Sequence, residues 1–233
     1  MEQADKTPLL PEIDGWSSIR RYDKRPIPDT VLRRILESAR RAPSWGNVQP
    51  WHFIVVRNPA RKELLKELAF GQKFVATADA VILCLGDFWA WKDRDKRIDQ
   101  LKELVSVLSS AHGRDIDQHV LEAYLDDPTV NPALKGTEVL IARQFEQLSL
   151  AIAFMGLQAK HEGVGSCIIG GFSNDLTGGN MELYTQVLAE FKIPNELILL
   201  SMVTLGYPLE TPKPRPRKPF DEVVSSEWFG VPF

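Results

Sequence analysis

The sequence predicts an α/β sandwich built on a mixed central sheet. Strand-like and helix-like patterns alternate along the chain, which is typical of a sheet covered by helices. Two continuous apolar runs, DAVILCLGD at 79–87 and ELILLSMVTLGYP at 196–208, have strand length and predict central strands buried on both faces. No GxGxxG motif follows the first predicted strand, which disfavours a dinucleotide-binding or P-loop fold.

The first long element is an amphipathic helix that begins at Asp29. In DTVLRRILESARRA the arginines lie opposite an apolar stripe, with Asp29 as the expected N-cap and Pro43 ending the helix. The stripe consists of Val31, Leu32, Ile35, Leu36 and Ala39. A strand over 52–57 follows, and then a helix that Asn58 caps and Pro59 starts.

Residues 88–138 differ from their surroundings because they are polar and favour helix throughout. We interpret them as a mobile helical insertion with an aromatic start. The apolar residues of its first long helix share one face: Ile98, Leu101, Leu104, Val105 and Leu108. Residues 1–16 form an N-terminal arm, and 17–233 form a single domain that carries this insertion.

The second half of the chain contains a helix over 138–161, about 36 Å long at 1.5 Å per residue. Its middle, Leu148 to Leu157, is apolar nearly all round, which predicts central burial or a surface shared with another subunit. The run SCIIGGF then predicts a short strand that breaks at Gly170-Gly171. A helix over 180–191, a second buried strand and a proline-rich basic tail complete the chain.

Composition and charge exclude several classes of function. The chain has 233 residues, with 28 lysines and arginines against 31 acidic residues, a net charge of −3. That balance argues against general nucleic-acid binding but leaves room for a local basic cluster around one small anion. The strongest apolar stretch is shorter than the ~20 residues that span a bilayer. No signal-peptide pattern is present, so we expect a cytoplasmic protein.

No set of side chains forms a convincing catalytic group. There is no GxSxG, and both cysteines, Cys84 and Cys167, lie in apolar runs without zinc spacing, so we expect structural thiols and no metal. His52 could face the core or a site, and Asp126-Asp127 reads as a capping or solvated pair. The other histidines are expected in solvent: His112, His119 and His161. A cofactor would therefore carry the chemistry of any enzyme built on this chain.

Two basic segments stand at opposite ends of the chain, SSIRRYDKRP at 17–26 and KPRPRKP at 213–219. Guanidinium groups bind phosphate through two parallel hydrogen bonds, and a neighbouring serine hydroxyl adds a donor. Each segment reads either as a solvated run or as part of a phosphate site. Residue patterns alone leave both interpretations open.

The stretch SSIRRYDKRPIPDTVLRRILESARRAPSWGNVQPWHFIVV resembles the opening of the FMN-dependent nitroreductase family. That family has an R-R-S-x-R segment, a P-x-P and a helix, and then A-P-S-x-x-N-x-Q-P-W before a strand. The likeness continues through FGQKF, EGVGSCIIGGF and the final PRPRKPFDEVV. It covers most of the chain except the arm and the insertion, and the A-P-S-x-x-N-x-Q-P-W stretch is its specific part.

The resemblance implies an α+β fold, a three-layer α/β/α sandwich with a mixed central sheet, in an intertwined homodimer. Two FMN would bind at the dimer interface, each held by residues of both chains. NAD(P)H would reduce FMN, and a nitroaromatic or quinone acceptor would then take the hydride by a ping-pong mechanism. Three specialised reactions remain open alternatives, reductive dehalogenation, flavin fragmentation and azoline oxidation, as does a non-enzymatic flavin-binding homologue.

The resemblance also implies which residues contact FMN, by motif. They are Ser18, Arg20, Pro43, Ser44, Asn47, Gln72, Gly170, Gly171, Arg215 and Arg217. Ser18 and Arg20 belong to the N-terminal flavin segment, with Arg20 a candidate for stabilising the N1/O2 edge, and the two C-terminal arginines would reach the phosphate. The loop of Pro43 would lie against the flavin of the partner subunit.

Other implied contacts involve the ring itself. Gln72 matches the amide at the pyrimidine edge, and the two glycines match a turn that approaches N5 closely. Phe88, Trp89 and Trp91 would roof the substrate pocket or simply pack, while Trp51 pins the loop to the core. The chain departs from the family at Trp16-Ser17, where an arginine is common. Arg21, Arg215 or Lys218 could compensate for that missing phosphate contact.

Overall fold

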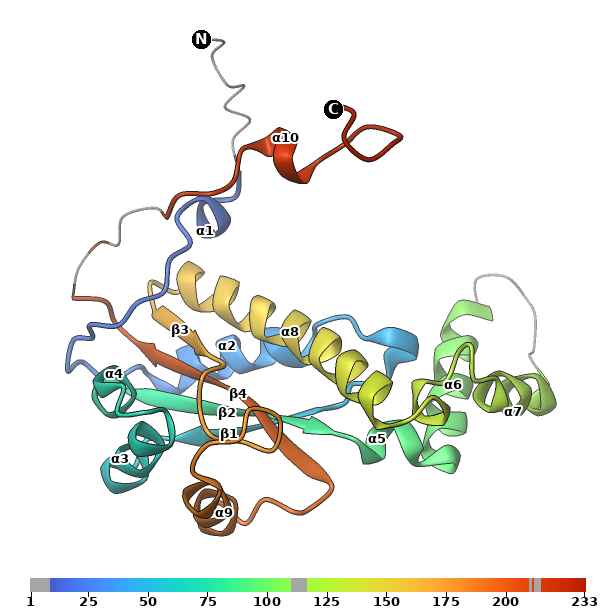
Figure 1. Cartoon of the computed structure of the whole chain (residues 1–233), viewed down its shortest axis with the longest axis horizontal. Helices are drawn as coiled ribbons and strands as arrows, with labels where there is room; N and C mark the ends of the chain where they lie inside the picture. The colour runs from blue at the N-terminus through green and yellow to red at the C-terminus, as the bar shows by residue number, and fades with distance from the viewer. Residues whose placement is uncertain (1–8, 110–116, 210, 212–214) are drawn as a thin grey trace.

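The computed structural model of the chain describes residues 9–109, 117–209, 211 and 215–233. A four-stranded sheet in the order β1-β2-β4-β3 forms the middle of the molecule (Figure 1). The strands are β1 (Trp51–Val56), β2 (Ala80–Asp87), β3 (Gly165–Ile169) and β4 (Leu197–Gly206). The helices are α1 (Pro11–Asp14), α2 (Asp29–Arg40), α3 (Pro59–Leu68), α4 (Lys73–Thr77), α5 (Trp89–Lys92), α6 (Arg94–Ser109), α7 (Gln118–Asp126), α8 (Thr137–His161), α9 (Met181–Glu190) and α10 (Phe220–Val223), with short 3-10 turns η1 (Trp45–Asn47) and η2 (Pro132–Leu134).

Every pairing between the described strands is antiparallel, so the mixed sheet predicted from the sequence is wrong for the single chain. The reason lies in the connections. Val56 at the end of β1 pairs with Val81 at the start of β2, because α3 and α4 together return the chain to the end of the sheet that it left. Alternation of strands and helices predicts the covering layers but not the direction in which each connection returns.

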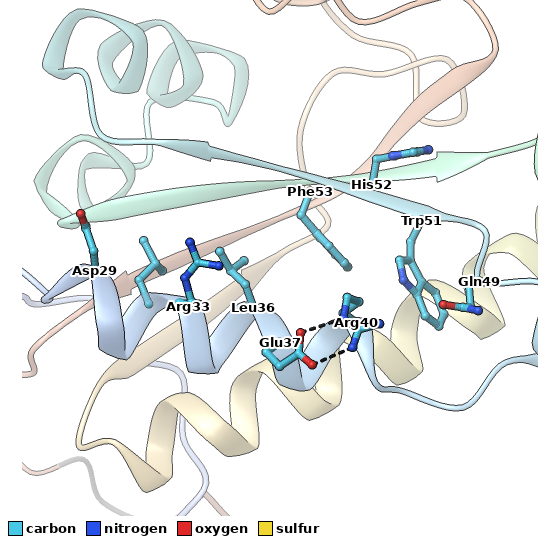
Figure 2. Close-up of a pocket in the computed structure, with 10 residues that line it drawn as sticks. Asp29, Arg33, Leu36, Glu37, Arg40, Gln49, Trp51, His52 and Phe53 are labelled. Atoms are coloured by element: carbon cyan, nitrogen blue, oxygen red, sulfur yellow. Dashed lines mark hydrogen bonds and ion pairs between the residues drawn. The ribbon is translucent and has the colours of Figure 1, made fainter.

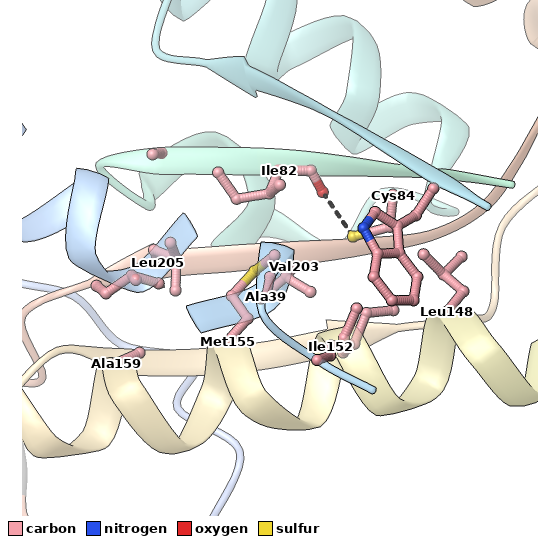
Figure 3. Close-up of a cluster of buried hydrophobic side chains, with 14 of the residues drawn as sticks. Ala39, Ile82, Cys84, Leu148, Ile152, Met155, Ala159, Val203 and Leu205 are labelled. Carbon is pink, nitrogen blue, oxygen red and sulfur yellow. Dashed lines mark hydrogen bonds between the residues drawn. The ribbon is translucent and has the colours of Figure 1, made fainter. Parts of the chain in front are cut away.

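Helices cover both faces of the sheet and confirm the three-layer α/β/α sandwich. On one face, β2 and β4 pack against α2 and α8. Figure 3 shows Leu148, Ile152 and Met155 of α8 pointing at Ile82 and Cys84 of β2. The opposite face of the sheet packs against α3, α4 and α9. The strands β2 and β4 are therefore buried on both sides, as their continuous apolar sequences predict.

The helix starts were partly predictable. Asn58 caps α3 by accepting a hydrogen bond from the Arg61 backbone N–H at 3.1 Å, which confirms that prediction. The predicted Asp29 cap is wrong, because Pro28 occupies the cap position of α2 and no side chain caps that helix. The Asp29 carboxylate instead accepts from Arg57 Nη1 at 2.6 Å.

The insertion folds into a separate helical layer at one end of the molecule (Figure 1). Ile98 and Leu101 of α6 pack against Leu121 and Leu125 of α7 in a small core of their own. Leu104 is half-buried on the predicted face. The side chain of Leu108, and His112, lie outside the described residues. Mobility of the insertion stays a prediction.

The long helix α8 buries one face and exposes another. Leu148, Ala151 and Met155 are buried against the sheet, whereas Leu150 and Phe154 remain 38% and 40% exposed. The prediction of central burial is therefore confirmed for one apolar face of α8. For the other apolar face, which is exposed in the single chain, a surface shared with another subunit stays a prediction. Among the described helices, none has the length and apolar character needed to cross a bilayer.

Candidate functional site

The segment that follows Trp16 runs along the outer edge of β3. The Ile19 backbone N–H donates to Ser166 O at 2.9 Å, and the Tyr22 hydroxyl lies 2.7 Å from Thr204 Oγ1. Ile19 fills the space over Gly165, where a Cβ would lie 2.7 Å from its side chain. These contacts of Ile19 and Tyr22 hold the neighbouring residues Ser18 and Arg20 beside β3.

Ser18 and Arg20 share one environment. Burial raises the pKa of the Cys167 thiol, while the positive charge of Arg20 and a hydrogen bond with Ser18 act in the opposite direction. The Arg20 guanidinium lies 5.7 Å from the centre of the Phe74 ring, at the start of α4. Arg20 is exposed to solvent, so its charge is available to a ligand.

The turn before α4 meets the glycine turn after β3. The Gln72 side-chain amide donates to Gly171 O, with 3.4 Å between the two atoms. The structure therefore brings Ser18, Arg20, Gln72, Phe74, Gly170 and Gly171 together, and we call these six residues the β3-edge cluster. Five of them were predicted from the sequence, and Phe74 was signalled only by its place in FGQKF.

The two glycines of this cluster have no role in packing. A Cβ on either residue would meet no atom within 4 Å, and neither has the left-handed backbone that favours glycine. Both are exposed. Nothing within the described part of this chain requires glycine at these two positions, so their predicted role at the ring of FMN stays a prediction.

The predicted loop of Pro43, Ser44 and Asn47 lies elsewhere along α8. The Trp45 backbone N–H donates to Gln147 Oε1 at 2.7 Å, and Ser44 Oγ accepts from the Gln49 N–H at 2.9 Å. Trp16, which leads into the β3-edge cluster, packs instead against Gly156. These two anchor points on α8 are nine residues apart, about 14 Å along the helix axis. A single chain therefore does not bring the loop to the cluster.

The two C-terminal arginines also lie away from the cluster. Arg217 Nη1 contacts the carbonyl oxygens of Arg215 and Pro216 at 3.4 and 3.3 Å, within its own segment. Both arginines are exposed, and Figure 1 shows the segment that carries them running away from the sheet toward α10. Their predicted phosphate contact stays a prediction.

The three aromatic residues at the start of the insertion, Phe88, Trp89 and Trp91, differ in burial and in their contacts. Trp91 is buried, and its Nε1 donates to Gln144 Oε1 at 2.9 Å. Phe88 is half-buried and packs on the core. Trp89 is the exposed member of the three and lines a cavity of about 400 Å³ with His52 and Asp87. Packing therefore accounts for Trp91 and Phe88, and Trp89 alone keeps an open face.

A groove of about 680 Å³ runs between α2 and β1 (Figure 2). Arg33, Glu37 and Arg40 line it from α2, and aromatic side chains line it from β1. Hydrogen bonds from Arg40 and Arg41 lower the pKa of Glu37 to about 2. This groove was not predicted from the sequence, although the arginines opposite the apolar stripe of α2 signalled a charged wall. None of the residues that the family motif assigns to FMN lines it, but His52, which could face the core or a site, does.

Packing explains why the chain has Trp16 where an arginine was expected. A Cβ on Gly156 would lie 2.1 Å from Cη2 of the indole, so the tryptophan crosses α8 at the one point where the helix leaves room for it. Lys160 Nζ donates to Gly15 O at 2.7 Å and holds the same segment. The departure thus belongs to the anchoring of residues 15 and 16 on α8.

The sequence of the chain is similar to those of several known proteins. A sequence model described as "Nitroreductase family" matches residues 13–207. The "NADH dehydrogenase" of Thermus thermophilus is 32% identical over 89% of this chain and 90% of its own length. The "Putative NAD(P)H nitroreductase YodC" of Bacillus subtilis is 26% identical over 95% of this chain and 99% of its own.

A solved structure shares the fold over nearly the same range. A "putative nitroreductase in complex with FMN" from Exiguobacterium sibiricum superposes with a TM-score of 0.68 and 25% identity. The likeness covers 93% of this chain and 95% of that one.

Proposed function

Because the chain belongs to the nitroreductase family, we propose that it is an FMN-dependent oxidoreductase that takes hydride from NAD(P)H and passes it to a small acceptor. The observation that carries the proposal is the β3-edge cluster. Three separate segments, at 18–20, 72–74 and 170–171, meet there with the residues that the family motif assigns to flavin binding. The relatives named above support NADH or NAD(P)H as the donor and FMN as the cofactor.

The residues of the cluster fit FMN. Gln72 carries an amide that can pair with the polar edge of a heterocyclic ring, and Arg20 is an exposed cation beside it. At Gly170 and Gly171 the space that a Cβ would enter is open, so a ligand could approach the backbone there. Ser18 adds a hydroxyl next to Arg20. This combination of an amide, a cation and an unobstructed backbone suits a planar ring that bears negative charge at one edge.

When bound, FMN supplies the hydride chemistry that the side chains of this chain lack. Arg20 would stabilise negative charge at the N1/O2 edge of the ring, because a fixed cation costs no reorganisation when the charge develops. Gln72 would orient that edge by hydrogen bonding. The glycines would let the backbone lie close to the ring plane and keep water out of that gap.

The cysteines support chemistry carried by a cofactor. Burial raises the pKa of both thiols, Cys84 and Cys167, so neither is an activated nucleophile near neutral pH. The described residues contain no group of three or more metal-ligating side chains. We propose that acceptors such as nitroaromatics or quinones take the place that NAD(P)H leaves, in a ping-pong sequence at one site. A reduced nicotinamide donor also favours a cytoplasmic location.

The site needs a second copy of the chain to be complete. The loop of Pro43, Ser44 and Asn47 and the arginines at 215 and 217 lie away from the cluster of their own chain. We propose a homodimer in which the loop of one protomer forms a wall for the flavin of its partner. The exposed apolar face of α8, with Leu150 and Phe154, supplies a surface for that contact.

The visible spectrum of the purified protein tests this function directly. A flavin band near about 450 nm that bleaches when NADH or NADPH is added without oxygen supports the reductive half-reaction. A bound flavin that neither nucleotide reduces would favour one of the specialised flavin reactions instead. A protein that stays colourless after reconstitution with FMN would overturn the proposal.

A further inference from the structure

The loop over residues 44–49 has a backbone conformation that contacts with neighbouring elements must stabilise. Three of its residues have left-handed φ values, Gly46 at 49°, Asn47 at 55° and Gln49 at 47°. Two of these carry side chains, for which that conformation is strained. Such a shape persists only where neighbouring elements fix it, so the contacts that surround the loop decide its structure.

Arg97 of α6 is one of those contacts, and it is an unusual one. Its side chain is buried, with 2% of its surface exposed. Nη2 donates to Gly46 O at 3.1 Å, and Nη1 donates to Gln100 Oε1 at 2.7 Å. Within the described residues no carboxylate forms an ion pair with it, and burial lowers its pKa. Burying a cation without a counterion costs free energy that only hydrogen bonds can offset, and Arg97 uses one of its two for the loop backbone.

Aromatic stacking joins the same loop to two more helices of the insertion. The Trp45 ring stacks on Trp91 of α5 at 6.0 Å between centroids and on Tyr124 of α7 at 5.8 Å. The Arg97 guanidinium lies 6.0 Å from the Trp45 ring centre. The insertion therefore reaches the loop through both a charged hydrogen bond and a run of three stacked rings.

The main body holds the loop from the other side through α8. Gln147 accepts from the Trp45 N–H, and Gln144 joins the insertion to the end of the loop by accepting from Trp91 and donating to Pro50 O. Both glutamines are buried. The loop thus lies between α8 and the insertion, and Arg97 of the insertion contacts the backbone of the loop at a left-handed residue.

We propose that Arg97 is a positioning residue through which the insertion fixes the shape of the 44–49 loop. The inference rests on the proposed function, because this loop is the one expected to form the partner's flavin wall. The helical insertion then acts as a buttress for the cofactor site. Arg97 acts through Gly46 and Trp45 and need not touch the flavin itself.

Arg97→Met tests the proposal, with Arg94→Met as the matched control on the same helix. Arg94 is exposed and pairs with Asp126, so its loss also weakens a link between α6 and α7 without reaching the loop. We expect Arg97→Met to speed hydrogen exchange at the Asn47, Val48 and Gln49 amides at least tenfold. It should also weaken FMN binding at least tenfold, while Arg94→Met changes both by less than twofold.

Two further measurements separate positioning from general stability. Arg97→Lys keeps a charged donor, and it should return loop exchange to within about threefold of the wild type because one hydrogen bond to Gly46 O can re-form. The hydrogen bonds of the Arg97 side chain go to Gly46 O in the loop and to Gln100 Oε1 within α6, so exchange of the backbone amides of α6 and α7 should not change. Faster exchange throughout α6 and α7, or an unchanged loop in Arg97→Met, would overturn the proposal.

The exchange measurement needs no flavin, so the two proposals fail separately. A wild-type protein that binds no FMN would sink the proposed function, while the apoprotein still reports whether Arg97 holds the loop. A wild type that binds and reduces FMN, with equal loop exchange and equal FMN affinity in Arg97→Met, would sink the Arg97 proposal alone.

Discussion

At the end of β3, Gly170 and Gly171 occupy positions that alanine would fit without strain or collision. Gly86 in β2 is the opposite case, because a Cβ there would lie 2.6 Å from Cγ of Gln144 and 2.8 Å from Leu200 Cδ1. Packing of the core requires glycine at position 86, whereas the proposed FMN site would account for Gly170 and Gly171. Because alanine fits at Gly171, an effect of that substitution on FMN binding would report a role in the site rather than a loss of folding.

Gly171→Ala should leave the free energy of unfolding of the apoprotein within about 0.5 kcal/mol of the wild type. It should weaken FMN binding at least tenfold, because a methyl group would occupy the side from which the ring approaches. Gly86→Ala is the control and should instead destabilise the fold by about 1–3 kcal/mol through overpacking. Urea unfolding and FMN titration measure the two effects, and an unchanged FMN affinity in Gly171→Ala would remove the glycine turn from the site.

Among the elements, the α2–α8 pair forms one covering layer of the sheet and carries both anchor points described above. Arg34 of α2 donates to both carboxylate oxygens of Glu162 just past the end of α8, at 2.7 and 2.8 Å. Ser38 Oγ donates to Phe154 O at 3.1 Å and joins the same two helices. The Arg34 hydrogen bonds lower the pKa of Glu162 from its ordinary 4.5 to about 2.

That lowered pKa predicts a pH-dependent contribution to stability. Because the carboxyl of Glu162 is more acidic in the folded state, its contribution is fully present above about pH 5 and is lost as pH falls toward 2. Glu162→Gln should lower the melting temperature by at most about 3 °C at pH 7, since the Arg34 side chain is half exposed and solvent screens the pair. The difference from the wild type should shrink as pH falls from 5 toward 2.5. A difference that stays constant over this range would mean that the ion pair does not link the helices.

The chain exposes large apolar side chains on the surface of a single copy. The C-terminal segment carries Phe220, Trp228, Phe229 and Phe233, with Trp228 73% exposed. Figure 1 shows this segment lying apart from the sheet. At the edge of the sheet, β1 pairs on only one side within the described residues, and the 680 Å³ groove runs beside it. These features support the proposed homodimer and suggest that the tail docks on the second copy.

Replacing Trp228 and Phe229 together with serine should weaken dimerisation at least tenfold and weaken FMN binding with it, because the site draws on both chains. Sedimentation equilibrium and FMN titration measure the two quantities. Val120→Ser is the matched control, since Val120 is an exposed apolar residue on α7, away from the tail. A double variant that remains fully dimeric and binds FMN normally would contradict the role of the tail.

Much of the fold and of the site could be predicted because local patterns encode local physics. The buried strands β2 and β4, the Asn58 cap and the long helix α8 follow from apolar runs and capping chemistry that each segment carries in itself. The residues of the β3-edge cluster followed from the family motif rather than from the patterns, and Phe74 was not assigned a role. What the sequence by itself determined is therefore which strands are buried on both faces and where α3 begins, while the segments that carry site chemistry stay a prediction.

Only the tertiary structure decided how those segments meet. The direction of β2 depends on where α3 and α4 return, the packing of Trp16 depends on Gly156, and the contact of Arg97 with Gly46 joins residues 51 positions apart. Each of these is a contact between distant parts of the chain. A local pattern reports the burial of a side chain but not the identity of its neighbour, because burial is a property of one residue and a contact is a property of two.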